Sequence, residues 1–173
     1  MDLTYYLINL GIAGLGRFLD IGSTWYASRT LLLESNLLAK KMGWKGILIF
    51  NIAICFLAAI DFHLSLIIFV VSALAASNNV GKAWVTQTVG EEEYSEIFKE
   101  WVRKAELKRL VFSNIGGSII FLSIGLILMF LTSNFDVVAV GFAFVIFSCA
   151  VIFHRSIAFY KMRKDREAKK NNS

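Results

Sequence analysis

Apolar residues form five long runs along the chain, and polar and charged residues collect in the short segments between them. An α-helix of about 20 apolar residues crosses a hydrocarbon core about 30 Å thick. The runs therefore predict an all-α integral membrane bundle with five transmembrane helices. We expect the spans at about residues 5–27, 46–60, 64–86, 110–131 and 135–155.

The segment 91–109, between the third and fourth runs, predicts a helix of a different kind. Three glutamates open it and basic residues crowd its end, as the helix dipole favours. Its apolar residues recur at helical spacing: Tyr94, Ile97, Phe98, Trp101 and Ala105. Such a basic amphipathic helix favours the cytoplasmic membrane surface. A cover packed over the end of the bundle would need similar residues, so both arrangements are open.

Composition and charge fit this topology. Hydrophobic residues make up 57% of the chain and the mean hydropathy is +0.62, which indicates a membrane protein. Of the 18 Lys and Arg, 15 lie outside the apolar runs in three clusters that flank them, so the net charge of +5 indicates orientation and not nucleic-acid binding. We expect a multi-pass protein of the cell membrane with its amino terminus outside. Residues 1–160 form the transmembrane domain, and 161–173 a basic cytoplasmic tail that ends disordered.

Two charges interrupt the first apolar run, in the stretch from Gly11 to Asn36. Each of Arg17 and Asp20 opposes membrane insertion by about 2.5–3.5 kcal/mol, so the chain must compensate them or use them. Polar residues recur at matched depth on the second and third runs, which predicts a binding site or pathway open toward the cytoplasm. Its expected residues are Arg17, Asp20, Thr24, Asn51, Asn79 and Lys82, with Asn78 pointing elsewhere. Arg29, Glu34 and Asn36 are expected at the inner interface.

Two interpretations of this polar cluster remain open. In the first it binds an ion, a proton or a polar headgroup, because three helices contribute at one depth. In the second Arg17 and Asp20 neutralise each other, and the asparagines and hydroxyls only join helices.

Enzyme motifs are missing from the sequence. His63 and His154 fall on opposite sides of the predicted membrane, and Cys55 and Cys149 are isolated in apolar segments. We therefore expect no enzyme, no metal and no cofactor.

The motif D-I-G-S-T at 20–24, E-S-N at 34–36, a short hairpin and N-N at 78–79 resemble a family of small uncharacterised archaeal and bacterial membrane proteins. Residues 9–90 carry the resemblance, which points to Asp20, Thr24, Glu34 and Asn36 and implies no activity. Leu37 stands where the family has proline.

The sequence thus predicts a small ion or solute channel or a transporter-like subunit. The alternative is a non-transporting accessory, scaffold or insertase-like subunit. The expected partners are the bilayer, anionic lipid headgroups at the inner face, and further copies of the chain or other subunits of a membrane complex.

Overall fold

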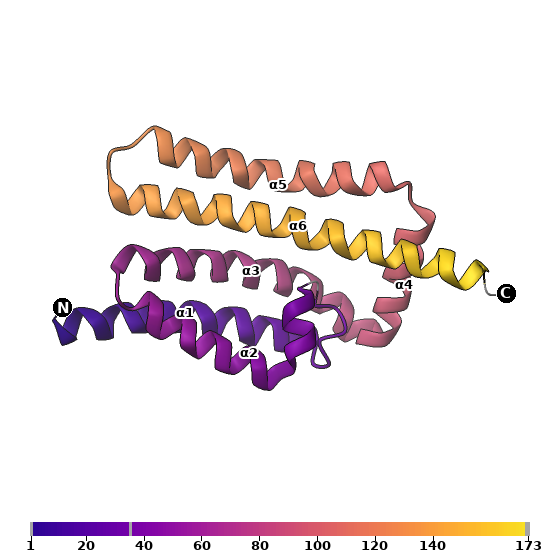
Figure 1. Cartoon of the computed structure of the whole chain (residues 1–173), viewed down its shortest axis with the longest axis horizontal. Helices are drawn as coiled ribbons and strands as arrows, with labels where there is room; N and C mark the ends of the chain where they lie inside the picture. Colours follow the sequence, from indigo (N-terminus) through magenta and orange to yellow (C-terminus); the bar gives the residue numbers. More distant parts are fainter. Residues whose placement is uncertain (1, 35, 172–173) are drawn as a thin grey trace.

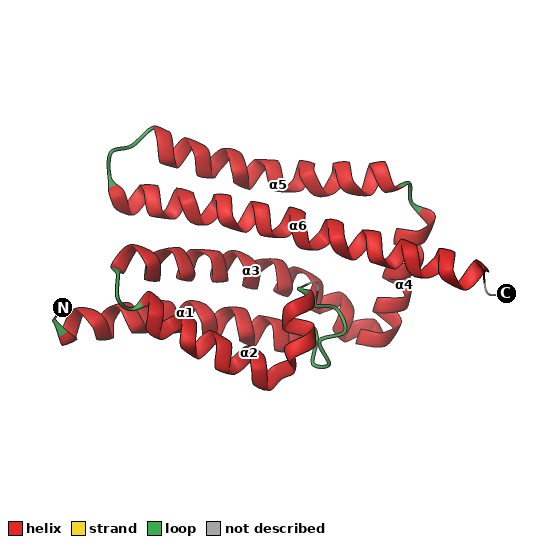
Figure 2. Cartoon of the chain, viewed as in Figure 1, coloured by secondary structure: helices red, strands yellow, loops and turns green. Residues whose placement is uncertain are grey.

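A computed structural model describes residues 2–34 and 36–171, and these residues form six α-helices (Figures 1 and 2). The helices are α1 (Leu3–Ala27), α2 (Leu37–Ala58), α3 (Phe62–Val89), α4 (Glu91–Lys104), α5 (Leu107–Phe130) and α6 (Phe135–Asn171). The expectation of an all-α protein is confirmed for the described residues.

Two closely packed helix pairs build the bundle. Helix α1 packs along α3, α5 packs along α6, and the α3–α6 contact joins the pairs. Helix α2 lies on α1 and makes smaller contacts with α1 and α3 than those two make with each other. The short α4 lies at the end of the bundle where α1, α3 and α6 finish, and the amino terminus lies at the other end (Figure 1).

Glycines allow both pairs to pack closely. A Cβ atom at Gly16 of α1 would lie 2.6 Å from the Cα atom of Phe69 in α3. In the second pair, a Cβ atom at Gly125 would lie 2.7 Å from the backbone oxygen of Gly141. A Cβ atom at Gly141 would lie 2.7 Å from the backbone oxygen of Gly125. Only glycine fits such backbone approaches, which are typical of packed membrane helices.

Within the described residues, four helices are long and apolar enough to cross a membrane, judged by length and composition: Leu38–Ala58, Phe62–Val89, Leu107–Phe130 and Phe135–Lys164. These correspond to the second to fifth runs of the sequence. Helix α1 is 25 residues long but is not among the four. Charged and polar residues such as Arg17, Asp20 and Asn9 lower its hydropathy.

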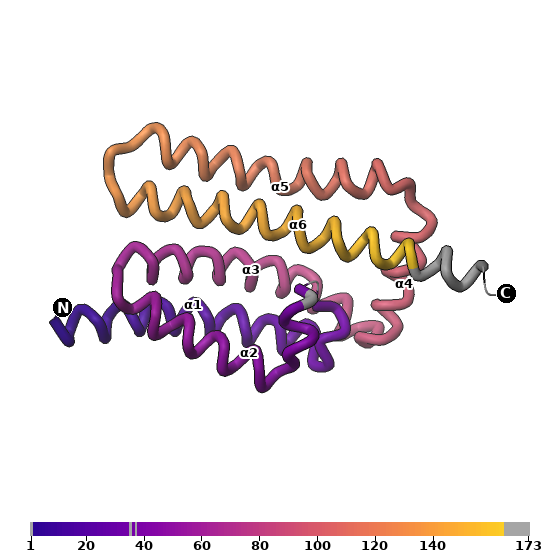
Figure 3. The backbone as a smooth tube through the Cα atoms, viewed as in Figure 1, coloured from indigo at the N-terminus to yellow at the C-terminus, as the bar shows by residue number. Residues whose placement is uncertain are grey.

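The boundaries of α2 differ from the prediction. The segment 40–45, which precedes the predicted span 46–60, belongs to this helix, because the side chain of Asn36 caps it by accepting hydrogen bonds from the N–H groups of Leu38 and Ala39. Gly43 has a φ of 65°, so the first turns run in a different direction from the rest (Figure 3).

Two further boundaries differ. The helix predicted over 91–109 ends at Lys104, where Ala105 is extended, and Leu107 already begins α5. Helix α6 continues through Lys161–Lys164, into the segment predicted as a tail.

The apolar face of α4 packs on the bundle. Val102 is 1% exposed, and the ring centroids of Phe98 and Phe159 of α6 lie 6.4 Å apart. Trp101, which the helical spacing placed on the same face as Phe98, is 61% exposed. One face of α4 thus packs over the end of the bundle as a cover, and an aromatic residue stays on the outside.

The close approach at Gly16 gives a stability prediction. Gly16→Ala is expected to destabilise the fold by about 1–3 kcal/mol relative to Gly14→Ala, because the new methyl group meets the Phe69 backbone. Gly14→Ala adds the same methyl group where no atom lies within 4 Å, and both variants gain the same helix propensity. Unfolding by sodium dodecyl sulfate in mixed micelles, followed by circular dichroism, measures the difference. Equal stability of the two variants would contradict the packing described.

Candidate functional site

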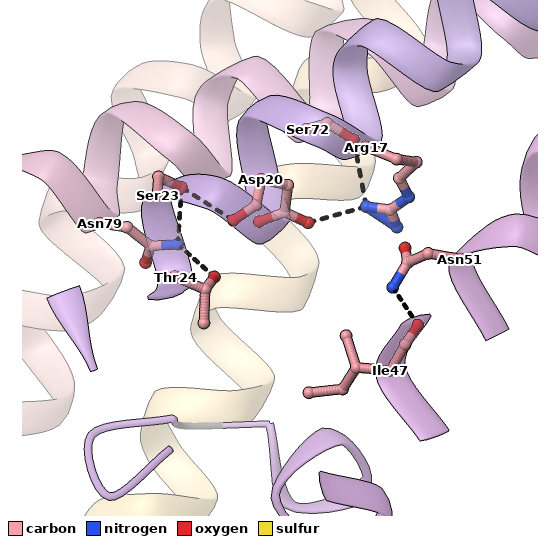
Figure 4. Close-up of polar contacts among 8 residues, drawn as sticks. All are labelled: Arg17, Asp20, Ser23, Thr24, Ile47, Asn51, Ser72 and Asn79. Carbon is pink, nitrogen blue, oxygen red and sulfur yellow. Dashed lines mark hydrogen bonds and ion pairs between the residues drawn. The ribbon is translucent and has the colours of Figure 1, made fainter. Parts of the chain in front are cut away.

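Arg17 and Asp20 lie one turn apart on α1 and contact each other. Arg17 Nη1 donates hydrogen bonds to Asp20 Oδ2 at 2.8 Å and to Ser72 Oγ of α3 at 3.1 Å (Figure 4). The two charged side chains are 17% and 25% exposed. The pair offsets part of the cost of two charges in a mostly apolar helix, and Ser72 fixes the pair against α3.

Asn79 joins α3 to the same face of α1. Its Nδ2 donates to Thr24 Oγ1 at 2.9 Å and to Ser23 Oγ at 3.3 Å (Figure 4). The Ser23 hydroxyl in turn donates to the backbone oxygen of Asp20 at 2.9 Å. The polar faces expected on the first and third runs therefore meet in the structure.

Asn51 approaches the pair from α2, and its carboxamide lies beside Arg17 (Figure 4). Its Nδ2 donates to the backbone oxygen of Ile47 at 2.7 Å. The residue is 9% exposed, and its Oδ1 has no hydrogen-bond partner within the described part of the chain. The Nε of Arg17 is likewise buried and without a partner there. Unpaired buried polar atoms are uncommon and costly.

A cavity of about 340 Å³ lies beside these residues, between α1, α2, α3 and α6. Seven residues expected at the site or at the inner interface line it: Arg17, Asp20, Thr24, Glu34, Asn36, Asn51 and Asn79. Lys82 and Arg29, also expected there, are not among the lining residues. Arg29 instead stacks over the Trp25 ring at 4.7 Å from its centroid, and its backbone oxygen accepts a hydrogen bond from Trp44 Nε1.

Helix α6 contributes polar residues that sequence reasoning missed. His154 and Arg155 line the cavity together with Asn78, whose Oδ1 accepts a hydrogen bond from Arg155 Nη2 at 2.7 Å. Asn78 therefore faces α6 and the cavity, whereas the helical pattern suggested that it points elsewhere. Phe147, Val151 and His154 are spaced by four and three residues, so helical periodicity along the fifth run is the signal that places His154 on the cavity face.

The cavity closes toward the end of the bundle that holds the amino terminus. Ala13, Cys55 and Ala58 form a buried cluster there with Leu10 and Ile68 packed against it. Asn9 Nδ2 also donates to the backbone oxygen of Ala59 at 3.2 Å, and the Tyr6 hydroxyl donates to that of Phe56 at 3.3 Å. These bonds hold α1 to the last turn of α2.

The loop 28–36 borders the other end of the cavity, and Glu91 holds it. The carboxylate of Glu91 accepts hydrogen bonds from the Ser28 hydroxyl, from Thr30 N at 3.2 Å and from Leu32 N at 3.0 Å. Leu31 between them has a φ of 59°, a conformation that is costly for leucine and is fixed by this clamp. Burial opposes ionisation of Glu91, but these hydrogen bonds outweigh it and lower the pKa of the carboxyl below its ordinary value.

The described residues hold no group of three or more His, Cys, Asp and Glu side chains that is arranged to bind a metal ion. No protein-family model, curated protein or solved structure matches the chain. The resemblance at residues 20–36 and 78–79 therefore stays a prediction, and the function must be argued from the cavity.

Glu91→Gln is expected to loosen the loop 28–36, because an amide has one acceptor oxygen where the carboxylate has two that are both occupied. Glu92→Gln is the matched control, since Glu92 is an exposed neighbour in the same first turn. Amide hydrogen exchange should quicken in the loop for Glu91→Gln alone. Identical exchange in the two variants would contradict a clamp at Glu91.

The same clamp should respond to pH. Because the folded-state pKa of Glu91 is lowered, the stabilisation is present above the ordinary value of 4.5 and is lost as the pH falls through the lower folded-state value. In Glu91→Gln, the protection of the loop amides against exchange should be low at every pH and should show no step as Glu91 would be protonated.

Proposed function

We propose that the chain crosses the membrane five times, with its amino terminus outside and its carboxyl terminus in the cytoplasm. The length of α1 and its close packing along α3 support a fifth span. The flanking basic clusters occur next to α4, at the start of α2 and along the end of α6, which lie at one end of the bundle (Figure 1). With this orientation, α4 covers the cytoplasmic end, and exposed Trp101 and the basic residues nearby face anionic headgroups.

We further propose that the protein binds an ion or a small polar solute in the cavity and acts as a transporter-like subunit of a homo-oligomer or a larger membrane complex. The observation that carries this proposal is a cavity of about 340 Å³ between α1, α2, α3 and α6 that is lined by the charged residues Arg17, Asp20, Glu34 and Arg155. The packed cluster around Ala13 favours a carrier over an open channel, because it closes the other half.

A second function is favoured by a different observation. Arg17 and Asp20 are bonded to each other, and interhelical hydrogen bonds recur elsewhere, as from Asn114 Nδ2 to Ser156 Oγ at 3.3 Å. Such bonds suit a scaffold, accessory or insertase-like subunit whose polar residues join helices. This alternative predicts that the chain transports nothing.

Cysteine labelling distinguishes a hydrated cavity from a dry interface. Ala150 lines the cavity, whereas its neighbour Cys149 is exposed on the outside of α6. In a Cys55→Ala, Cys149→Ala background, Ala150→Cys is expected to react with a charged, membrane-impermeant methanethiosulfonate added at the basic end. Cys149 in a Cys55→Ala chain is the matched control and should stay unlabelled, because it faces lipid.

The side of labelling tests both the topology and the cavity. Reaction in inside-out vesicles alone supports the proposal, and reaction from the outer side alone would reverse the orientation. Labelling from both sides would indicate a continuous channel, and no labelling from either side would leave the scaffold function.

Flux measurements test whether the protein transports a solute through the cavity. In proteoliposomes, we expect flux of at least one probe among protons, rubidium, chloride, glycine and glutamate, with at least a tenfold loss in Asp20→Asn. Lys41→Gln, on the exposed first part of α2, should keep the wild-type flux. A labelled cavity without flux of any probe would favour the accessory function.

A further inference from the structure

Of the four carboxylate and guanidinium side chains in the cavity wall, two have no ion-pair partner among the described residues. Arg17 and Asp20 form a pair, whereas no described residue forms an ion pair with Arg155 or Glu34. Arg155 donates to the neutral amide of Asn78, and the Glu34 carboxylate accepts a hydrogen bond from its neighbour Asn36 N at 2.7 Å. One cation and one anion therefore line the same small space without an ion-pair partner, although the charge of Lys82, which lies outside the lining, also acts on both.

The deeper part of the cavity also has one hydrogen-bond acceptor and one donor that are unpaired. The Oδ1 of Asn51 is an acceptor without a donor, and Arg17 Nε is a donor without an acceptor, among the residues that the structure describes. Asn51 is more than nine-tenths buried and lies beside the cavity. The site thus offers one acceptor and one donor, as well as one negative and one positive charge.

From this arrangement, and resting on the proposed function, we infer that the ligand is a small zwitterion. Its anionic group, a carboxylate or phosphate, binds Arg155, and its ammonium group binds Glu34. A ligand with a single charge leaves one of these residues unpaired, so the cavity discriminates against it. At about 30 Å³ for each water molecule, the cavity has room for about ten, which suits a molecule the size of an amino acid or a lipid headgroup.

The cavity walls admit such a zwitterion from two sources. In the proposed orientation, the aqueous phase beyond the basic end supplies free amino acids. Helices α2 and α6 both line the cavity but do not pack substantially on each other, and apolar residues line both sides of the space between them: Ile47, Phe50, Phe147 and Val151. A zwitterionic phospholipid can place its headgroup in the cavity through this side while its acyl chains stay in the bilayer.

The test compares three probes of nearly equal size. β-Alanine carries both charges, propionate only the negative one and propylammonium only the positive one. In detergent-solubilised full-length protein, β-alanine is expected to raise the Tm by several degrees and to slow labelling of Ala150→Cys at least tenfold, with little effect of the other two. A second set of measurements applies the same two readouts to glycerophosphoethanolamine and to short-chain phosphatidylethanolamine. Phosphatidylglycerol of equal chain length is the control.

Charge-removing variants complete the test. Arg155→Gln and Glu34→Gln are each expected to weaken the zwitterion at least tenfold, and Arg155→Lys should restore most of the effect because it keeps the charge. Lys41→Gln is the control for a basic residue outside the cavity.

Each outcome decides the inference. An effect of β-alanine or of either ethanolamine compound that needs both Arg155 and Glu34 supports it, and the arm that responds identifies the source. Equal effects of the singly charged probes, or no effect of any zwitterion, would overturn it. If Ala150→Cys is labelled while no zwitterion protects it, the inference alone fails, whereas absence of labelling removes the proposed function itself.

Discussion

A charge inside a membrane bundle must be compensated, and the bundle is arranged around that requirement at Arg17. The guanidinium reaches Asp20 on its own helix and Ser72 on α3, and it reaches Ser72 because Gly16 lets the backbones of α1 and α3 approach closely. A larger residue at Gly16 would move the helices apart and lengthen the bond to Ser72. Packing and electrostatics are thus coupled at two consecutive positions in the chain.

The cavity exists because α2 stands apart from α6. Asn36 starts α2 early, the positive φ of Gly43 turns its first part, and the bonds from Asn9 and Tyr6 hold only its last turn against α1. Between these two fixed ends the helix does not close the space beside Asn51. A helix that packed fully on α6 would bury Arg155 and Glu34 without ion-pair partners, so the open space also lowers an electrostatic cost.

The sequence was sufficient to predict the long helices and the polar faces of α1 and α3. Run lengths predicted the long helices, and helical periodicity placed Thr24 and Asn79 on the faces that meet. It was insufficient for Arg155, because a basic residue at the end of a run looks like a topology signal and only the three-dimensional structure places it beside Asn78. The turn at Gly43 also depends on tertiary contacts, since glycine permits a positive φ but does not require it.

The two ends of the cavity are held by bonds of different strength, which suggests which part moves. At the end near α4, Glu91 fixes the loop 28–36 through three donors, one of them a hydroxyl, and the charge of the carboxylate strengthens each bond. At the end that holds the amino terminus, neutral Asn9 and Tyr6 donate single bonds at 3.2 and 3.3 Å. Neutral bonds of this length are weaker than charge-assisted ones. The last turn of α2 is therefore the contact whose separation from α1 would open the amino-terminal end of the cavity at least cost, while the clamp at Glu91 keeps the loop 28–36 in place.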